Sequence, residues 1–280
     1  KMEIPFILTR YLYIKEDVYI SLVISVFEKD YDQSLFWASE LYFSGFQKET
    51  IEFIYAIYTT YFESNNPKLK NIMDVGLLRY DAGIHIAATM LLNLTSKRRD
   101  FTLQDFVMKN EKQEPIENAK EKETKVIIFS DIQEATKYEN YLDNNVLSRE
   151  VLRKACLYKS CKHLSDVFNC SYKVMEQQDL YREHVYNWLY YASFTPIWEK
   201  RIEEYNGIID DEKKTVLFSD ENMEEFYELY GYDVDEQSKE VQDKMMQTSL
   251  VKQFTNHDLL QKYEKNRKTK KLKLVNNISS

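Results

Sequence analysis

The chain has 280 residues, of which 44% are hydrophobic and 14% aromatic, so it can bury a large core without disulfides or metal ions. It has only five glycines and four prolines, which argues against a sheet-rich fold, because the turns of such folds consume these residues. Its formal net charge of -8 argues against general nucleic-acid binding by the body of the protein.

The N-terminal residues 1–17, KMEIPFILTRYLYIKED, lack the small-residue cleavage site of a signal peptide. No stretch of about 18 residues in the chain is free of charged and polar side chains, as a membrane-spanning helix requires. We therefore expect a soluble protein that is not secreted and has no membrane partner.

Three amphipathic helices are predicted near the start of the chain. Apolar residues recur at every third or fourth position in residues 16–29, 32–44 and 48–63, which is the spacing of one helix face. Gly45 can adopt the left-handed conformation that ends the second helix, and SNNP at 64–67 interrupts the third. Helices joined by such short connections are expected to stack as pairs.

A longer apolar segment at 69–94 predicts either one helix or two. Gly76 and Gly83 are seven residues apart, so on a single helix they would lie on nearly one face. The missing side chains on that face would let another backbone approach closely.

Residues 109–125 contain almost only charged, amide and hydroxyl side chains, too little apolar surface to offset the entropy of ordering. They are predicted to form a flexible linker that divides the chain. The predicted regions are an N-terminal helical region (1–108), the linker (109–125), a C-terminal helical region with a hairpin (126–232), and a tail that is first acidic and then basic (233–280).

Two segments beyond the linker, 126–141 and 215–230, each give a short apolar run, then FSD, then a helical pattern. The serine or aspartate after the run supplies an N-cap oxygen for the helix. Residues 208–210 are predicted to pair with 215–218 as a β-hairpin across a charged turn. Further helices are predicted at 148–160, 163–170, 174–193 and 196–205.

Pro196 stands inside NWLYYASFTPIWEKRIEEYNG, which otherwise has the pattern of one long helix. Proline lacks the N–H that a helix interior needs, but the first helical turn has no acceptor for that N–H. We therefore predict that one helix ends near Ser193 and that the next has Thr195 as its N-cap and Pro196 as its first residue. Trp188 and Trp198 would then fix the corner by burying large rings.

Cys156, Cys161, His163 and Cys170 are the residue types that bind structural zinc. Their spacing lacks the close Cys-x2-Cys step, and on one helix the first two would be about 140° apart. Buried reduced thiols are the simpler interpretation, and an odd number of cysteines favours a reducing compartment over a disulfide framework. We predict no metal and no cofactor.

Asp81 and His85 are one helical turn apart and could form an acid–base pair for catalysis. The simpler interpretation is a histidine satisfied by a carboxylate at i,i+4. The sequence has no phosphate-binding glycine loop, nucleophile elbow or HExxH helix. We predict a protein that is not an enzyme, in which the 22 tyrosines and 15 phenylalanines mainly build the core.

The charge is distributed unevenly towards the C-terminus. Residues 262–274 carry seven Lys or Arg against one Glu, whereas the carboxylates of 227–244 either dock a basic partner or form a solvated surface. A detached basic segment is a common RNA-binding device. The residues predicted to contact RNA phosphates are Lys262, Lys265, Arg267, Lys268, Lys270, Lys271 and Lys273.

Three stretches also resemble an uncharacterised protein family of nucleocytoplasmic large DNA viruses, including mimivirus relatives. They are YLYIKEDVYISLVISVF with SLFWASELYFSGF near the start, NWLYYASFTPIWEKRI in the middle, and FYELYGYDVDEQSKEVQ near the end. The resemblance implies a viral protein that acts in the cytoplasm of an infected host cell, including the viral factory, with viral or host proteins as partners. It implies no reaction.

Together these features predict a mainly α protein of stacked helix pairs with a small β-hairpin in its C-terminal half. The expected function is a non-enzymatic helical scaffold or adaptor that mediates protein–protein interaction. The alternative is an RNA-associated helical adaptor, similar in kind to translation-initiation scaffolds, that uses the basic tail.

Overall fold

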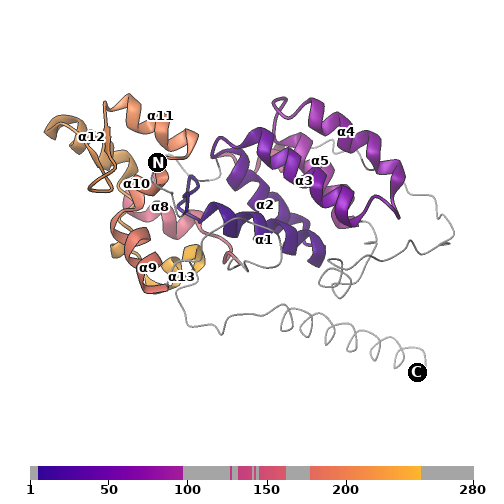
Figure 1. Cartoon of the computed structure of the whole chain (residues 1–280), viewed down its shortest axis with the longest axis horizontal. Helices are drawn as coiled ribbons and strands as arrows, with labels where there is room; N and C mark the ends of the chain where they lie inside the picture. Colours follow the sequence, from indigo (N-terminus) through magenta and orange to yellow (C-terminus); the bar gives the residue numbers. More distant parts are fainter. Residues whose placement is uncertain are drawn as a thin grey trace, which may run out of the picture.

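The computed structural model describes residues 6–96, 127, 132–140, 142, 145–161 and 177–246. These residues are mainly helical, with one two-stranded antiparallel sheet in the C-terminal half, which confirms the predicted fold class (Figure 1). Three predictions lie outside the described residues: the linker 109–125, the helix 163–170 and the basic segment 262–274. The short apolar run that begins the segment 126–141 lies outside them too, apart from Ile127.

Five helices form the N-terminal half of the molecule. They are α1 (Lys15–Glu28), α2 (Tyr31–Tyr42), α3 (Gln47–Tyr61), α4 (Lys70–Leu78) and α5 (His85–Ser96), with a 3-10 turn at Pro67–Leu69. α1 packs on α2, and α5 lies against all four of the other helices (Figure 1). The bounds of α1, α2 and α3 confirm the three predicted amphipathic helices to within two residues, the usual uncertainty of a helix end.

The connections around α2 follow from local side-chain chemistry. Lys29 ends α1 in the left-handed region with φ 62°, and the Asp30 carboxylate caps α2 by accepting from the backbone N–H of Gln33 at 3.0 Å. Gly45 follows α2 with φ +104°, and a Cβ added there would lie 2.5 Å from Cβ of Pro196. Only glycine fits this place, because it needs both a left-handed backbone and close contact with Pro196, the first residue of α11 (Pro196–Glu204).

The segment 69–94 forms two helices, α4 and α5, and not one. Gly83 lies in the turn between them with φ +126°, so it does not share a helix face with Gly76. Gly76 does allow a close approach, because a Cβ added to it would lie 2.5 Å from the Met90 sulfur of α5. The single-helix alternative, with both glycines on one face, is therefore wrong.

The C-terminal half consists of shorter elements. They are α7 (Ile132–Thr136), α8 (Ser148–Ala155), α9 (Gln177–Tyr186), α10 (Trp188–Ala192), α11 (Pro196–Glu204), β1 (Ile208–Asp210), β2 (Thr215–Leu217), α12 (Asp220–Tyr230), a 3-10 turn at Val234–Glu236, and α13 (Lys239–Met246). Two predicted helices are shorter than expected. Asn187 is not helical, with ψ 24°, and separates α9 from α10, while the helix predicted at 148–160 ends at Ala155. Beyond Ala155 the backbone bonds elsewhere, since the N–H of Ser160 donates to the Lys244 carbonyl at 2.9 Å.

The corner at Pro196 forms as predicted. Pro196 is the first residue of α11, Thr195 is its N-cap, and the rings of Trp188 and Trp198 meet edge to face with centroids 5.4 Å apart. The Thr195 hydroxyl does not cap the helix, however; it donates to the Leu8 carbonyl. The corner is thereby bonded to the N-terminal segment.

The β-hairpin pairs Ile208 with Leu217 and Asp210 with Thr215, as predicted from the charged turn between them. The Asp210 carboxylate accepts from the backbone N–H groups of Glu212 and Lys213 and so stabilises the turn. Ser219 then caps α12, with its hydroxyl accepting from the Asn222 N–H at 3.4 Å. The predicted FSD cap is thus confirmed at this second site.

Residues 233–246, assigned from sequence to the acidic start of the tail, are packed in the structure. Val234, Val241 and Met245 are buried, and the Gln242 side chain donates to the Val234 carbonyl at 3.0 Å. Charged residues separate the apolar residues of this stretch, so its composition is that of a solvated tail even though the apolar side chains are buried. The body of the protein therefore extends to α13.

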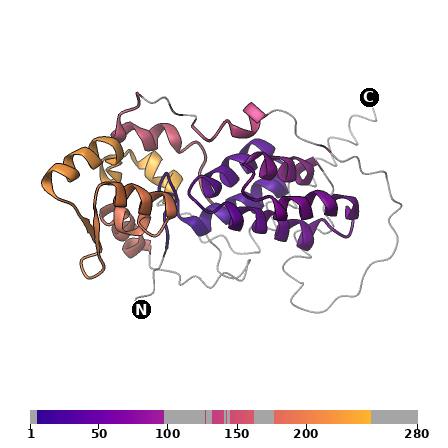
Figure 2. The same ribbon diagram turned by 90° about the horizontal axis from the view of Figure 1, so that it is seen from above.

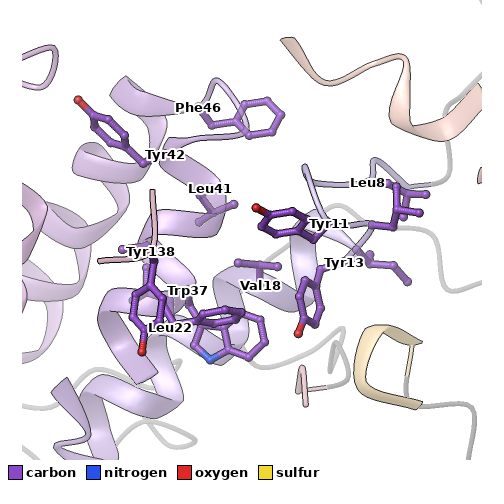
Figure 3. Packing of buried hydrophobic residues seen from close by; sticks show 14 of the residues in the cluster. Leu8, Tyr11, Tyr13, Val18, Leu22, Trp37, Leu41, Tyr42, Phe46 and Tyr138 are labelled. Carbon is purple, nitrogen blue, oxygen red and sulfur yellow. The ribbon is translucent and has the colours of Figure 1, made fainter. Parts of the chain in front are cut away.

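The N-terminal residues 6–14 join the two halves. The Leu8 N–H donates to the Tyr191 carbonyl, the Trp198 indole N–H donates to the Thr9 carbonyl at 3.1 Å, and Tyr13 packs edge to face on Trp37 with centroids 5.1 Å apart (Figure 3). One hydrophobic core accordingly runs through both predicted helical regions. Within the described part of the chain, no helix has the length and apolar character needed to cross a membrane.

Candidate interaction surface

Neither the catalytic acid–base pair considered from sequence nor the simpler i,i+4 contact between Asp81 and His85 is formed among the described residues. Asp81 is exposed in the turn before α5, whereas His85 is the first residue of that helix and packs beside Gly83. No hydrogen bond or ion pair joins Asp81 to His85 in the structure as described. The two residues are not one turn apart on a helix, because α5 begins only at His85.

The candidate zinc ligands are only partly described, since His163 and Cys170 lie outside the described residues. Cys156 is fully buried with its sulfur 3.8 Å from the Tyr11 carbonyl, and burial raises the pKa of its thiol. Cys161 is partly buried, and its backbone N–H donates to the Ser21 hydroxyl at 2.7 Å. Among the described residues, no group of three or more His, Cys, Asp or Glu could hold a metal ion. The seven tail residues predicted to bind RNA also lie outside the described residues.

One buried polar cluster is centred on Glu40. Its carboxylate is fully buried and accepts from the Thr9 hydroxyl at 2.7 Å, the Tyr11 backbone N–H at 3.0 Å and the Arg10 side chain at 3.0 Å. Arg10 also donates to the carbonyls of Tyr138 at 2.6 Å and Glu139 at 2.9 Å. The donors and acceptors are matched within the chain, so the cluster holds residues 6–14 in place and offers no reacting group.

A second cluster surrounds Asp32 near the surface. Its carboxylate accepts from Lys137 and from the hydroxyls of Tyr138 at 2.9 Å and Tyr158 at 2.6 Å. Burial alone would raise the pKa of Asp32, but the hydrogen bonds from Lys137, Tyr158 and Tyr138 outweigh it and lower the pKa. The ionised Asp32 carboxylate, with its three donors, therefore joins α2 to the residues that follow α7 and α8.

A third cluster joins α9 to the hairpin. Glu183 accepts from the Tyr191 hydroxyl at 2.6 Å, the Asn187 amide at 3.0 Å and the Lys214 ammonium at 2.9 Å. Burial opposes ionisation of Glu183, but these three donors together lower its pKa. The neighbouring His184 is fully buried and bonded to the Leu12 carbonyl at 2.8 Å. These side chains stabilise the fold by joining α9 to the hairpin and to the N-terminal segment.

The surface of the C-terminal half is strongly acidic. Residues 177–246 contain 18 Asp or Glu against seven Lys or Arg, a net charge of -11. Most of the other described acidic segments are balanced by nearby cations, as in the ion pairs of Lys15 with Glu49 and Lys48 with Glu52. The net charge of the whole chain, -8, therefore understates the negative electrostatic potential at this end of the molecule.

The acidity is concentrated on the outer side of α12. Its glutamates stand at positions i, i+3, i+4 and i+7, which places them on one helix face, and all four are exposed; they are Glu221, Glu224, Glu225 and Glu228. The opposite side of the helix is anchored by Phe226, whose buried ring stacks on Phe218 with centroids 4.6 Å apart. We call the exposed side of α12 the α12 face.

Among the described residues, no cation pairs with the α12 face. α12 contains five acidic residues and no Lys or Arg, and none of its carboxylates forms an ion pair with another described residue. Every other described helix of eight or more residues that contains Asp or Glu takes part in at least one ion pair. Like charges one turn apart destabilise a helix when nothing offsets them.

Apolar side chains flank the glutamates. Met223 is 46% exposed and Tyr227 36% exposed on one flank, and Leu229 is 55% exposed on the other. The nearby hairpin exposes the cross-strand pair Ile208 and Leu217 as well. Hairpin and α12 together form one end of the molecule, opposite to α3 and α4 (Figure 2). An acidic face with apolar flanks fits a protein segment that is basic and partly apolar.

From sequence, the carboxylates of 227–244 were expected either to dock a basic partner or to form a solvated surface, and the α12 face adds to that expectation. The apolar residues of 234–246 are packed while Asp235, Glu236 and Glu240 are exposed, and the α12 face extends the acidic surface to earlier residues, over 221–228. Two features could be seen in the sequence: the spacing of the four glutamates, and the absence of Lys and Arg between Thr215 and Gln237. What could not be inferred from the sequence is that no other described residue forms an ion pair with these glutamates.

The comparisons with known proteins add no family: no protein-family model matches the sequence, and neither the curated proteins nor the solved structures contain a match.

Proposed function

We propose that the chain is a non-enzymatic helical adaptor that binds other proteins through the α12 face. The observation that supports this function most directly is the acidic helix with exposed apolar flanks, which has no ion pair among the described residues and is anchored to the body by Phe226. Desolvated apolar contacts supply affinity, and complementary charge supplies association rate and selectivity. The partner is accordingly a protein with a basic, partly apolar segment.

The resemblance of three segments to a family of large DNA viruses supports a viral origin for this adaptor. Its partners would then be viral or host proteins in the cytoplasm of the infected cell, including the viral factory. The polar clusters around Glu40, Asp32 and Glu183 support a role without catalysis, because each is satisfied within the fold.

The test is quantitative capture of partners with matched charge variants. The α12 variant combines Glu224→Gln, Glu225→Gln and Glu228→Gln. The control variant combines Glu52→Gln, Glu63→Gln and Asp81→Asn, which also removes three negative charges, but from the other half of the body. A partner of the α12 face is recovered by wild type and by the control variant, and its recovery falls about tenfold with the α12 variant. Equal recovery by all three proteins would refute the assignment of the site.

A second candidate function, an RNA-associated adaptor, is supported by the basic segment 262–274 with its net charge of +6. This function uses the tail and not the α12 face. The two functions are therefore separable, because removal of the tail abolishes RNA binding and leaves the α12 face intact.

A further inference from the structure

The α12 face lacks a counter-charge in the described body, yet the same chain contains one. Residues 262–274, KYEKNRKTKKLKL, carry seven Lys or Arg against one Glu, and they also include Tyr263, Leu272 and Leu274. Their mixture of basic and apolar side chains is the chemistry that the α12 face fits. We propose that this segment docks on the α12 face of its own chain and covers it until a partner displaces it, an inference that rests on the proposed function.

The tether is long enough for docking within one chain. Tyr230, the last residue of α12, is joined to Met246 by an eight-residue connection and the eight residues of α13, so the two are separated by at most about 40 Å. Residues 247–261 lie between Met246 and the basic segment, and 15 residues can span about 50 Å. The segment can therefore reach α12 without any change in the body.

Tethering makes a weak contact effective. Because the basic segment and the α12 face belong to one chain, they meet at an effective concentration in the millimolar range, so an affinity too low to matter between separate molecules suffices within one chain. The contact depends on Coulomb attraction between exposed groups, so it weakens as salt is added. A partner with a denser basic segment, or a polyanion that captures the tail, would release the α12 face.

The occupant is the tail and not a second copy of the face, because two α12 faces repel each other. Docking of the tail also relieves the repulsion among Glu221, Glu224, Glu225 and Glu228, which the rest of the described chain leaves in place. One end of the protein thus regulates the other. Deletion of the tail should expose the α12 face permanently.

The test is zero-length carbodiimide cross-linking of the full-length chain, which joins a lysine ammonium to a carboxylate only when the two are in contact. Lys15 and Glu49, 2.7 Å apart, serve as an internal control for the reaction. Mixing isotopically labelled and unlabelled chains separates links within one chain from links between chains. We expect links from the tail lysines to the α12 glutamates, within single chains, at low salt.

Docking also predicts that links from the tail to any carboxylate of α12 or its neighbours fall about tenfold in the α12 variant and are unchanged in the control variant. Three results overturn the proposal: tail links distributed over all exposed carboxylates, tail links only between chains, or no tail links while Lys15 and Glu49 are joined. Each of these leaves the proposed function standing if partner recovery still depends on the α12 glutamates. Loss of that dependence, with tail links intact, would instead refute partner binding alone.

Discussion

At the scale of single residues, His184 shows how the N-terminal segment is held. Its ring is fully buried on α9 and bonded to the Leu12 carbonyl at 2.8 Å, and Leu12 itself has the strained backbone angle φ 62°. Burial lowers the pKa of His184 to about 4, against 6.5 for a free histidine, although the bond to Leu12 acts in the opposite direction.

His184 therefore makes stability depend on pH in a definite direction. Below about pH 6.5 the unfolded chain takes up a proton at this histidine, whereas the folded chain does so only near pH 4. The free energy of unfolding should fall by up to about 3 kcal/mol as the pH drops through that window. Urea denaturation at pH 7, 5.5 and 4 measures it, with His184→Gln as the variant that cannot titrate. If wild type and variant lose stability in parallel, His184 is not the group responsible.

Arg10 and Glu40 give a second prediction at this scale. Both side chains are buried, 5% and 0% exposed, so Glu40→Leu leaves a buried guanidinium without a counter-charge and should cost about 3–5 kcal/mol. Combining it with Arg10→Met removes the stranded charge, so the double variant should lose less than the sum of the single variants by about 1–3 kcal/mol. Denaturant titration of the three variants measures this coupling. Additive losses would mean that the two residues act independently.

At the scale of elements, the sequence predicts those whose signal is local. Pro196 and Thr195 mark the start of α11, the charged turn marks the hairpin, and the apolar spacing marks α1 to α3. Breaks that depend on tertiary contacts were not predictable. α8 ends early because residues after it bond to Lys244 and Ser21, and these partners are distant in sequence.

α12 gives the prediction at this scale, because function and stability should oppose each other there. In a chain that lacks residues 262–280, so that the tail cannot offset the charge, neutralising Glu224, Glu225 and Glu228 removes repulsion between like charges one turn apart and should increase stability by about 0.5 kcal/mol. Thermal unfolding at low salt measures the gain, which should shrink as salt is added. A loss of stability would show that the glutamates make favourable contacts and that the face is not kept acidic at a cost.

At the scale of the whole molecule, the mainly α architecture with a small hairpin is predictable from composition and periodicity alone. The joining of the two halves is not, because residues 6–14 have no periodic pattern and are fixed by side chains from α9, α11 and α2. The acidic α12 face could be found in part, from the spacing of its glutamates. Its lack of counter-charges is a property of the folded body, since it depends on where every Lys and Arg lies.

The basic tail carries the prediction that separates the two candidate functions. Single-stranded RNA binding by Lys262 to Lys273 releases counterions, with a logarithmic salt slope of roughly -0.7 per phosphate, or about -4 for six contacts. Removing residues 262–280 should abolish this binding without unfolding the body. Fluorescence anisotropy across a salt series measures it. A full-length chain without salt-sensitive RNA affinity would rule out the RNA adaptor.

The central claim, that the α12 face receives a partner protein, is tested most directly by photo-cross-linking in cells. A photoreactive amino acid replaces Met223 on the α12 face, and in a matched control it replaces Leu78 on α4, which is 82% exposed in the other half of the body. Irradiation should join the Met223 position to a discrete partner protein, and the α12 variant should lose that adduct while the Leu78 position gives none. Equal adducts from both positions, or an adduct from Leu78 alone, would contradict the account.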